Sequence, residues 1–172
     1  MNNSILITKP LKKIPNILIY YHKFTTNFSM CDLKKNRYVG EMIAYPSRNI
    51  KDQFLYIKNI NISPEFRKQG YGTKFLDFAQ TLSKKLGLNG RLATTADPLL
   101  TDHGNPPHLF LRKYGFGTED SATNRKFDKL ISKDVQLKKK ESYACNMFYP
   151  AKPLEPTFLE QCISSVKKFF RK

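Results

Sequence analysis

The chain has 172 residues, of which 40% are hydrophobic and 26% charged, and this balance excludes fibrous and fully disordered classes. At about 150 residues per domain, the length corresponds to one domain that can bury a core without disulfides or structural metal. Lys and Arg outnumber Asp and Glu by 30 to 14, so the net charge is +16. This excess fits either a polyanionic partner such as nucleic acid or a compositional bias toward lysine, and we favour the bias.

The three cysteines, Cys31, Cys145 and Cys162, lack C-x-x-C spacing, so we expect reduced thiols rather than a disulfide framework. No run approaches the ~18 apolar residues of a membrane span. The first twenty residues do not have the order of a signal peptide, because prolines interrupt the apolar run and lysines follow its start. These features predict a cytoplasmic protein.

The first half of the chain predicts β-structure. We expect an irregular lead-in over the first fifteen residues and a strand near 16–22. Two strand-like runs at 27–33 and 37–45 are separated by Lys34-Lys35-Asn36, a polar turn suited to a hairpin. The run 54–62 gives the strongest strand signal because it is rich in aromatic and β-branched residues, although its alternation is imperfect.

The second half predicts helices between shorter strands. Apolar residues at helical spacing predict a helix that begins at Gly72 or Thr73 and ends before Gly87, followed by a strand at 88–95. A loop at 97–105 then leads into a short helix that begins at the Pro106-Pro107 pair and ends before Gly115. We expect a late antiparallel pair formed by 126–131 and 142–149.

The last 22 residues differ from the rest. We predict that 1–150 form the main domain and that 151–172 form a proline-rich linker and an amphipathic basic helix from about Pro156 to Phe170. The helix is expected to pack on the domain. A homodimer contact and a membrane-surface contact are the alternatives.

Residues 67–72 carry the clearest chemical signal, Arg67-x-x-Gly70-x-Gly72 between a strand and a helix. Glycines at these positions allow backbone N–H groups to point into one concavity, and the helix start adds unpaired donors and a favourable dipole. The pattern is neither a P-loop nor a G-x-G-x-x-G motif, since Phe75 occupies the third glycine position. It predicts a phosphate-binding loop.

The wider pattern is Ile60-x-Ile62-x-Pro64-x-Phe66-Arg67-x-Gln69-Gly70-x-Gly72, with Lys113-x-Gly115-Phe116 downstream, and it resembles the GNAT family of N-acetyltransferases over 54–117. The resemblance implies an α/β (α+β) fold in which helices flank a mixed, mostly antiparallel sheet. Acetyl-CoA would be the cosubstrate, held in a cleft between strands 54–62 and 88–95. The implied cofactor-binding residues are Ile60, Ile62, Arg67, Lys68, Gln69, Gly70, Tyr71, Gly72 and Thr73.

The resemblance also implies acetyl transfer to a primary amine of a small molecule or protein, by direct attack on the thioester. The alternative is a protein of the same fold that binds nucleic acid or regulates without transfer. Many relatives carry an acidic tyrosine where this chain has Leu111, so we name Tyr114 as a substitute acid and His103 or His108 as the base. The histidine and cysteine spacing fits no zinc pattern, and we predict no metal site.

Overall fold

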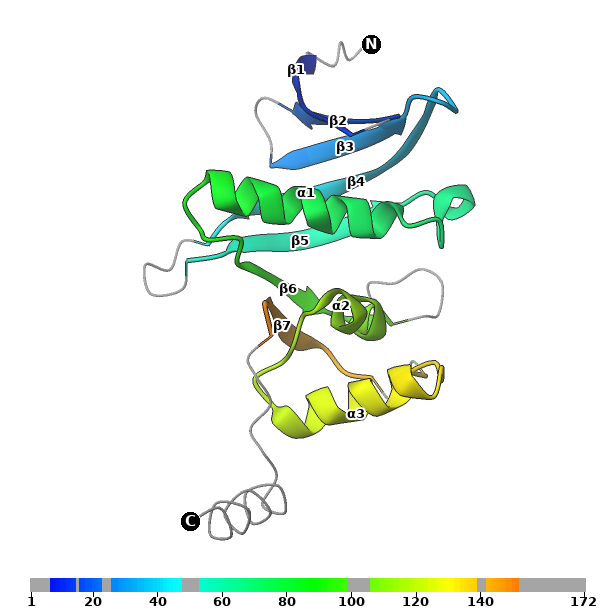
Figure 1. The fold of residues 1–172 in the computed structure, drawn as a ribbon, viewed down its shortest axis with the longest axis vertical. Helices are drawn as coiled ribbons and strands as arrows, with labels where there is room; N and C mark the ends of the chain where they lie inside the picture. Colours follow the sequence, from blue (N-terminus) through cyan, green and yellow to red (C-terminus); the bar gives the residue numbers. More distant parts are fainter. Residues whose placement is uncertain are drawn as a thin grey trace, which may run out of the picture.

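The protein is built around a seven-stranded sheet whose strands lie in sequence order (Figure 1). The computed structural model describes residues 7–14, 16–22, 26–47, 53–98, 106–138 and 142–151. All neighbouring strands pair antiparallel except β5 and β6, which are parallel because helix α1 joins them. The mixed, mostly antiparallel fold class is therefore confirmed. The strands are β1 (Ile7–Ile14), β2 (Ile17–His22), β3 (Asn27–Asp32), β4 (Arg37–Pro46), β5 (Leu55–Ile62), β6 (Leu92–Ala96) and β7 (Cys145–Tyr149).

In the described part of the chain, three α-helices accompany the sheet: α1 (Tyr71–Lys85), α2 (His108–Tyr114) and α3 (Ser121–Ser132). Helix α1 runs along β4 and β5, while α2 packs on α3 (Figure 1). A short 3₁₀ turn, η1 (Pro64–Phe66), lies between β5 and α1. The hydrophobic core lies between α1 and the central strands. Its buried residues include Met30, Met42, Ile57, Phe75 and Leu76.

Two predictions about secondary structure are wrong. The lead-in contains β1, an edge strand whose register is irregular on both sides of Pro10, which is where an edge strand tolerates proline. Residues 126–131 belong to helix α3, so β7 pairs with β6. Asp120 caps α3 by accepting hydrogen bonds from the N–H groups of Ala122 and Thr123, and Phe127 buries one face of the helix.

The imperfect alternation of β5 reflects a β-bulge. The β4–β5 register skips Lys58, so this residue is an extra one on β5. A one-residue insertion reverses the faces of all following side chains. Leu55 and Ile57 are buried before the bulge, and Ile60 and Ile62 pack against the core after it. The bulge therefore explains why the apolar residues of β5 change from odd to even positions along the strand.

A close backbone approach stabilises the far half of β5 against β4. A Cβ atom on Gly40 would lie 2.2 Å from the carbonyl oxygen of Asn61, so only glycine fits there. No helix among the described residues is long and apolar enough to cross a membrane. The predicted linker and helix at 152–172 lie outside the described residues, and the domain boundary at 150 stays a prediction.

Candidate active site

The site begins where two parallel strands separate. β5 and β6 pair over a short stretch that ends at Ile57 and Thr94, and no further pair of described residues follows. β5 continues to Ile62 and β6 to Ala96, so a wedge opens between them. The backbone edge of β5 beyond the wedge is thus available to a ligand.

A loop of unusual backbone conformation lies at the wide end of the wedge. Lys68 and Gly70 have φ values of +57° and +81°, and Gly70 is the N-cap of α1. No side chain caps α1 and its first turn contains no acidic residue, so the first N–H groups of the helix have no internal acceptor. The Nε of Arg67 donates to the carbonyl oxygen of Ile62 at 2.8 Å, which anchors the loop to β5. This arrangement fits a phosphate group.

Tyr71 anchors the loop to Asp32 at the end of β3. Its side chain is buried and its hydroxyl donates to Asp32, which also accepts hydrogen bonds from the N–H groups of Lys34 and Lys35. The hydrogen bond from Tyr71 is the main reason that the pKa of Asp32 is lowered. The same bond, with burial, raises the pKa of Tyr71 to about 12. Tyr71 therefore shapes the loop and stays protonated.

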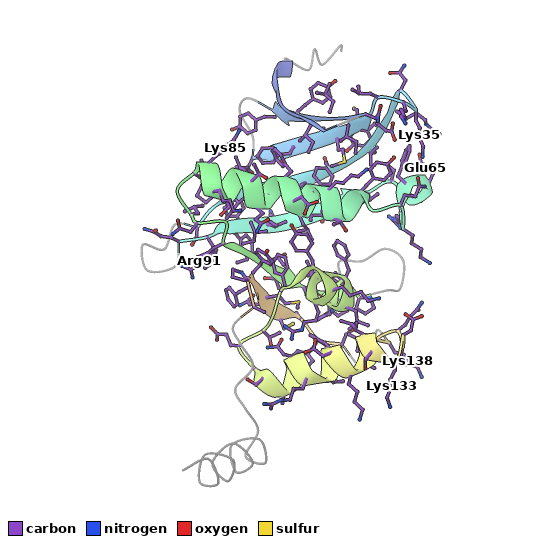
Figure 2. All side chains as sticks on the ribbon, in the orientation of Figure 1. Lys35, Glu65, Lys85, Arg91, Lys133 and Lys138 are labelled. Carbon is purple, nitrogen blue, oxygen red and sulfur yellow. The ribbon has the colours of Figure 1, made fainter. Side chains whose placement is uncertain are left out.

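Cationic side chains surround this end of the site. The Nζ of Lys35 lies 5.1 Å from the centroid of the Phe66 ring, and the Nζ of Lys74 lies 4.9 Å from that of Tyr71. Figure 2 shows Lys35 and Glu65 near each other on the right-hand side of the molecule, where η1 lies. Glu65 also forms an exposed ion pair with Arg37, at 3.4 Å.

A cleft of about 780 Å³ occupies the wedge. It lies in the upper part of the ~300–1,000 Å³ range that is usual for small-molecule sites. Its walls come from β5, the loop, the start of α1, the end of β6 and α2. Eight of the nine predicted cofactor-binding residues line it: Ile60, Ile62, Arg67, Lys68, Gly70, Tyr71, Gly72 and Thr73.

The ninth residue, Gln69, does not line the cleft. Its side-chain amide donates to the carbonyl oxygen of Glu65 at 2.6 Å and accepts from Lys35 at 2.9 Å. Its side chain therefore holds the loop to η1 and to the β3–β4 turn, while its backbone remains part of the loop.

The predicted acid is not in the cleft. Leu111, at the position where many relatives have tyrosine, lines the cleft and is only 6% exposed. Tyr114 is not among the lining residues, and its hydroxyl donates to Asp77 at 2.8 Å. Burial, followed by the bond to Asp77, raises the pKa of Tyr114 well above its usual range. This geometry argues against Tyr114 as an acid toward a ligand in the cleft.

The predicted bases are not placed in the cleft either. His103 lies outside the described residues. His108 is 1% exposed, its Nε2 lies 2.8 Å from the carbonyl oxygen of Tyr143, and its ring packs edge-on against Phe127. Burial lowers its pKa, which favours the neutral form. His108 faces a second, smaller cavity rather than the cleft.

Other residues line the narrow end of the cleft. Thr94 belongs to the last β5–β6 pair, Thr95 follows it on β6, and Asp97 comes directly after the strand. Asp97 is the only carboxylate among the described lining residues. Phe110 of α2 covers Gly72 so closely that an added Cβ would lie 3.0 Å from its ring. The sequence analysis assigned no role to Asp97, and it missed Phe110 because the α1–α2 contact leaves no local signal in the sequence. The described residues contain no cluster that could hold a metal ion.

The model of the acetyltransferase (GNAT) family matches residues 8–116. This match covers more than half of the chain, and the chain therefore belongs to the GNAT family. No curated protein matches the chain.

Solved structures of acetyltransferases resemble this chain with low sequence identity and low TM-scores. Nourseothricin acetyltransferase is 19% identical, with a TM-score of 0.46, over 78% of this chain and 65% of that one. Ard1 from Thermoplasma volcanium is 16% identical, with a TM-score of 0.46, over 74% and 72%. A Bacillus subtilis acetyltransferase in complex with CoA is 16% identical, with a TM-score of 0.45, over 71% and 74%. At these values the likeness carries no argument about substrate, and the chain spans just under two thirds of the first of these proteins.

Proposed function

We propose that the protein is an N-acetyltransferase that transfers the acetyl group of acetyl-CoA to a primary amine. The observation that carries this proposal is the cleft at the β5–β6 wedge, which has a loop suited to phosphate at its wide end. Family membership supports acetyl-CoA as the cosubstrate. A pyrophosphate would accept hydrogen bonds from the N–H groups of residues 68–73, beside Arg67 and Lys68.

The rest of the cofactor would lie along β5. The strand edge near Ile60 and Ile62 has no strand partner on the β6 side among the described residues, so its backbone groups can bind the amides of the pantetheine arm. The thioester would then reach the vertex of the wedge, near Ile57 and Thr94. This placement brings the acetyl carbon next to Thr95 and Asp97.

Asp97 is the base in this proposal. The acceptor ammonium gives a proton to Asp97, and the free amine attacks the thioester carbon. As the tetrahedral intermediate collapses, the C–S bond breaks, the amine nitrogen loses its second proton to solvent and the leaving thiolate takes up a proton, so that the products are the amide, CoA-SH and one released proton. Leu111 presents methyl groups where a phenol would act as acid, so the thiolate is protonated by solvent or by the protonated Asp97.

The first test is turnover. Purified protein is mixed with acetyl-CoA and a panel of primary amines, and both the released CoA thiol and the acetylated amine are measured. We expect both products in equal amounts with at least one amine. If CoA and acetyl-CoA fail to raise the melting temperature and no amine is acetylated, the proposal is wrong.

The second test addresses Asp97. The substitution Asp97→Asn should lower kcat by about 10²- to 10⁴-fold while the Kd for acetyl-CoA stays unchanged, because a general base acts only on the chemical step. Asp134→Asn is the matched control, since Asp134 is exposed at the end of α3 and away from the cleft. Equal kcat values for the two variants would show that Asp97 is not the base.

A further inference from the structure

A second cavity lies between α2, α3 and residues 142–143. Its volume is about 260 Å³, below the ~300–1,000 Å³ of most drug-sized sites, so it cannot hold a coenzyme. Helix α2 separates it from the cleft, because Phe110 and Leu111 line the cleft while His108 lines the second cavity. Nothing in the proposed transfer reaction uses this space.

His108 brings an unused hydrogen-bond acceptor to the cavity. Its Nε2 lies 2.8 Å from the carbonyl oxygen of Tyr143, and a carbonyl only accepts, so Nε2 carries the hydrogen. In this tautomer Nδ1 has a lone pair and no hydrogen. Nδ1 is buried and has no hydrogen-bond partner among the described residues. A buried polar atom without a partner is uncommon and indicates a missing donor.

Tyr143 supplies a second acceptor. The carboxylate of Asp120, whose pKa is lowered mainly by its hydrogen bond with Thr123, can only accept, so the Thr123 hydroxyl donates to it. The Tyr143 hydroxyl lies 2.8 Å from the Thr123 oxygen and must therefore donate its own hydrogen there. Its oxygen lone pair is then directed to other donors. Tyr143 is 57% exposed, so this lone pair is open to solvent, whereas Nδ1 of His108 is buried. A ligand group with several N–H donors would bond to both acceptors.

Lys126 of α3 is the charged side chain among the described lining residues of the cavity, and it is exposed, which favours an anion at the cavity mouth. Phe127 supplies an apolar wall. Asp97 lines the cleft rather than this cavity, and its negative charge opposes the effect of burial on the pKa of His108.

We propose that this cavity binds a small α-amino acid. The ligand's ammonium group donates to Nδ1 of His108 and to the hydroxyl oxygen of Tyr143, while its carboxylate pairs with Lys126 and its side chain packs on Phe127. One ammonium and one carboxylate thus use every polar feature of the cavity described above. The proposal does not depend on acetyl transfer and can be tested without acetyl-CoA.

The experiment uses the full chain labelled with ¹⁵N and follows the Nδ1 resonance of His108 during titration with L-alanine. We expect a saturable shift with a Kd on the order of 1 mM. Propionate lacks the ammonium and L-alaninol lacks the carboxylate, so neither should shift the resonance at the same concentration. Lys126→Ala should weaken L-alanine binding about fivefold. Lys129→Ala, an exposed lysine one turn further along α3 that does not line the cavity, should leave it unchanged.

Any of three results would overturn the proposal: an Nδ1 resonance that L-alanine leaves unmoved, equal L-alanine binding by Lys126→Ala and Lys129→Ala, or a ligand-free protein whose Nδ1 is already bonded to a donor of its own chain. An equal response to propionate or alaninol would also contradict the amino-acid assignment. Both lysines are exposed, so neither substitution should prevent folding.

Discussion

Gly70 gives the sharpest test of the phosphate-binding loop. A negative side chain at this position, in Gly70→Glu, would lie among the N–H groups that we expect to bind the pyrophosphate of CoA. Gly87 offers a matched control at the other end of α1. The two glycines have φ values of +81° and +76°, and an added Cβ would meet no atom within 4 Å at either one. Both substitutions to glutamate therefore carry the same backbone strain, about 1–2 kcal/mol, and the same added charge.

The difference between the variants is then electrostatic and local. Two unit charges ~5 Å apart interact by ~0.8 kcal/mol at a dielectric constant of 80 and by ~3.3 kcal/mol at 20. We take ~2 kcal/mol as the repulsion between the carboxylate added in Gly70→Glu and a pyrophosphate, which corresponds to a ~30-fold weaker Kd. Isothermal titration with CoA should show this loss for Gly70→Glu and none for Gly87→Glu.

Gly70→Ala separates charge from backbone strain. It has the same strained φ without the carboxylate, so it should lower the melting temperature and still bind CoA. The reasoning fails if Gly70→Glu binds CoA as tightly as Gly87→Glu. It also fails if Gly70→Ala loses as much affinity as Gly70→Glu, because the effect would then come from loop conformation.

Three further predictions concern side chains around the cleft. Leu111→Tyr should raise kcat at least tenfold by installing a phenol in the cleft wall, whereas Leu111→Phe should not, which steady-state kinetics can measure. Tyr114→Phe should leave kcat within about twofold, because its hydroxyl bonds to Asp77 outside the cleft; a 100-fold loss would restore Tyr114 as the acid. Tyr71→Phe should raise the pKa of Asp32 toward its usual value. A carboxyl group whose pKa is lowered on folding stabilises the fold at pH values above its pKa in the unfolded chain, which is ~3.9 for Asp. Urea denaturation at pH 7 should therefore show a lower free energy of unfolding for the variant than for the parent protein, and the difference should shrink as the pH falls below ~3.9.

Local patterns predicted most of the fold. The run from β5 through the loop into α1 was recognisable because strand composition, glycine placement and helical spacing are all local properties. The prediction of a strand at 126–131 was wrong because the apolar residues of this short run, Phe127, Leu130 and Ile131, do not distinguish a helix from a strand. The helical character becomes visible only from Asp120 onward, where the cap and the buried Thr123 extend the pattern.

The two ends of the site differed in how far sequence could predict them. The loop depends on neighbouring residues, and eight of the nine predicted residues line the cleft. The reactive end depends on contacts between segments that are far apart in sequence. Leu111 and Tyr114 are three residues apart, which leaves them about 60° apart around a helix. That rotation directs one side chain into the cleft and the other toward Asp77 of α1.

The charged lining residues are arranged asymmetrically along the cleft. Arg67 and Lys68 lie at the loop end, Lys58 lies at the bulge, and Asp97 lies beyond the vertex of the wedge. Under the proposed function, an anionic pyrophosphate would be attracted to one end and a cationic amine to the other, which would orient donor and acceptor before reaction. Part of the +16 charge would then act at the phosphate end, while the acceptor end would have a carboxylate. The proposal therefore favours an acceptor that approaches as an ammonium ion.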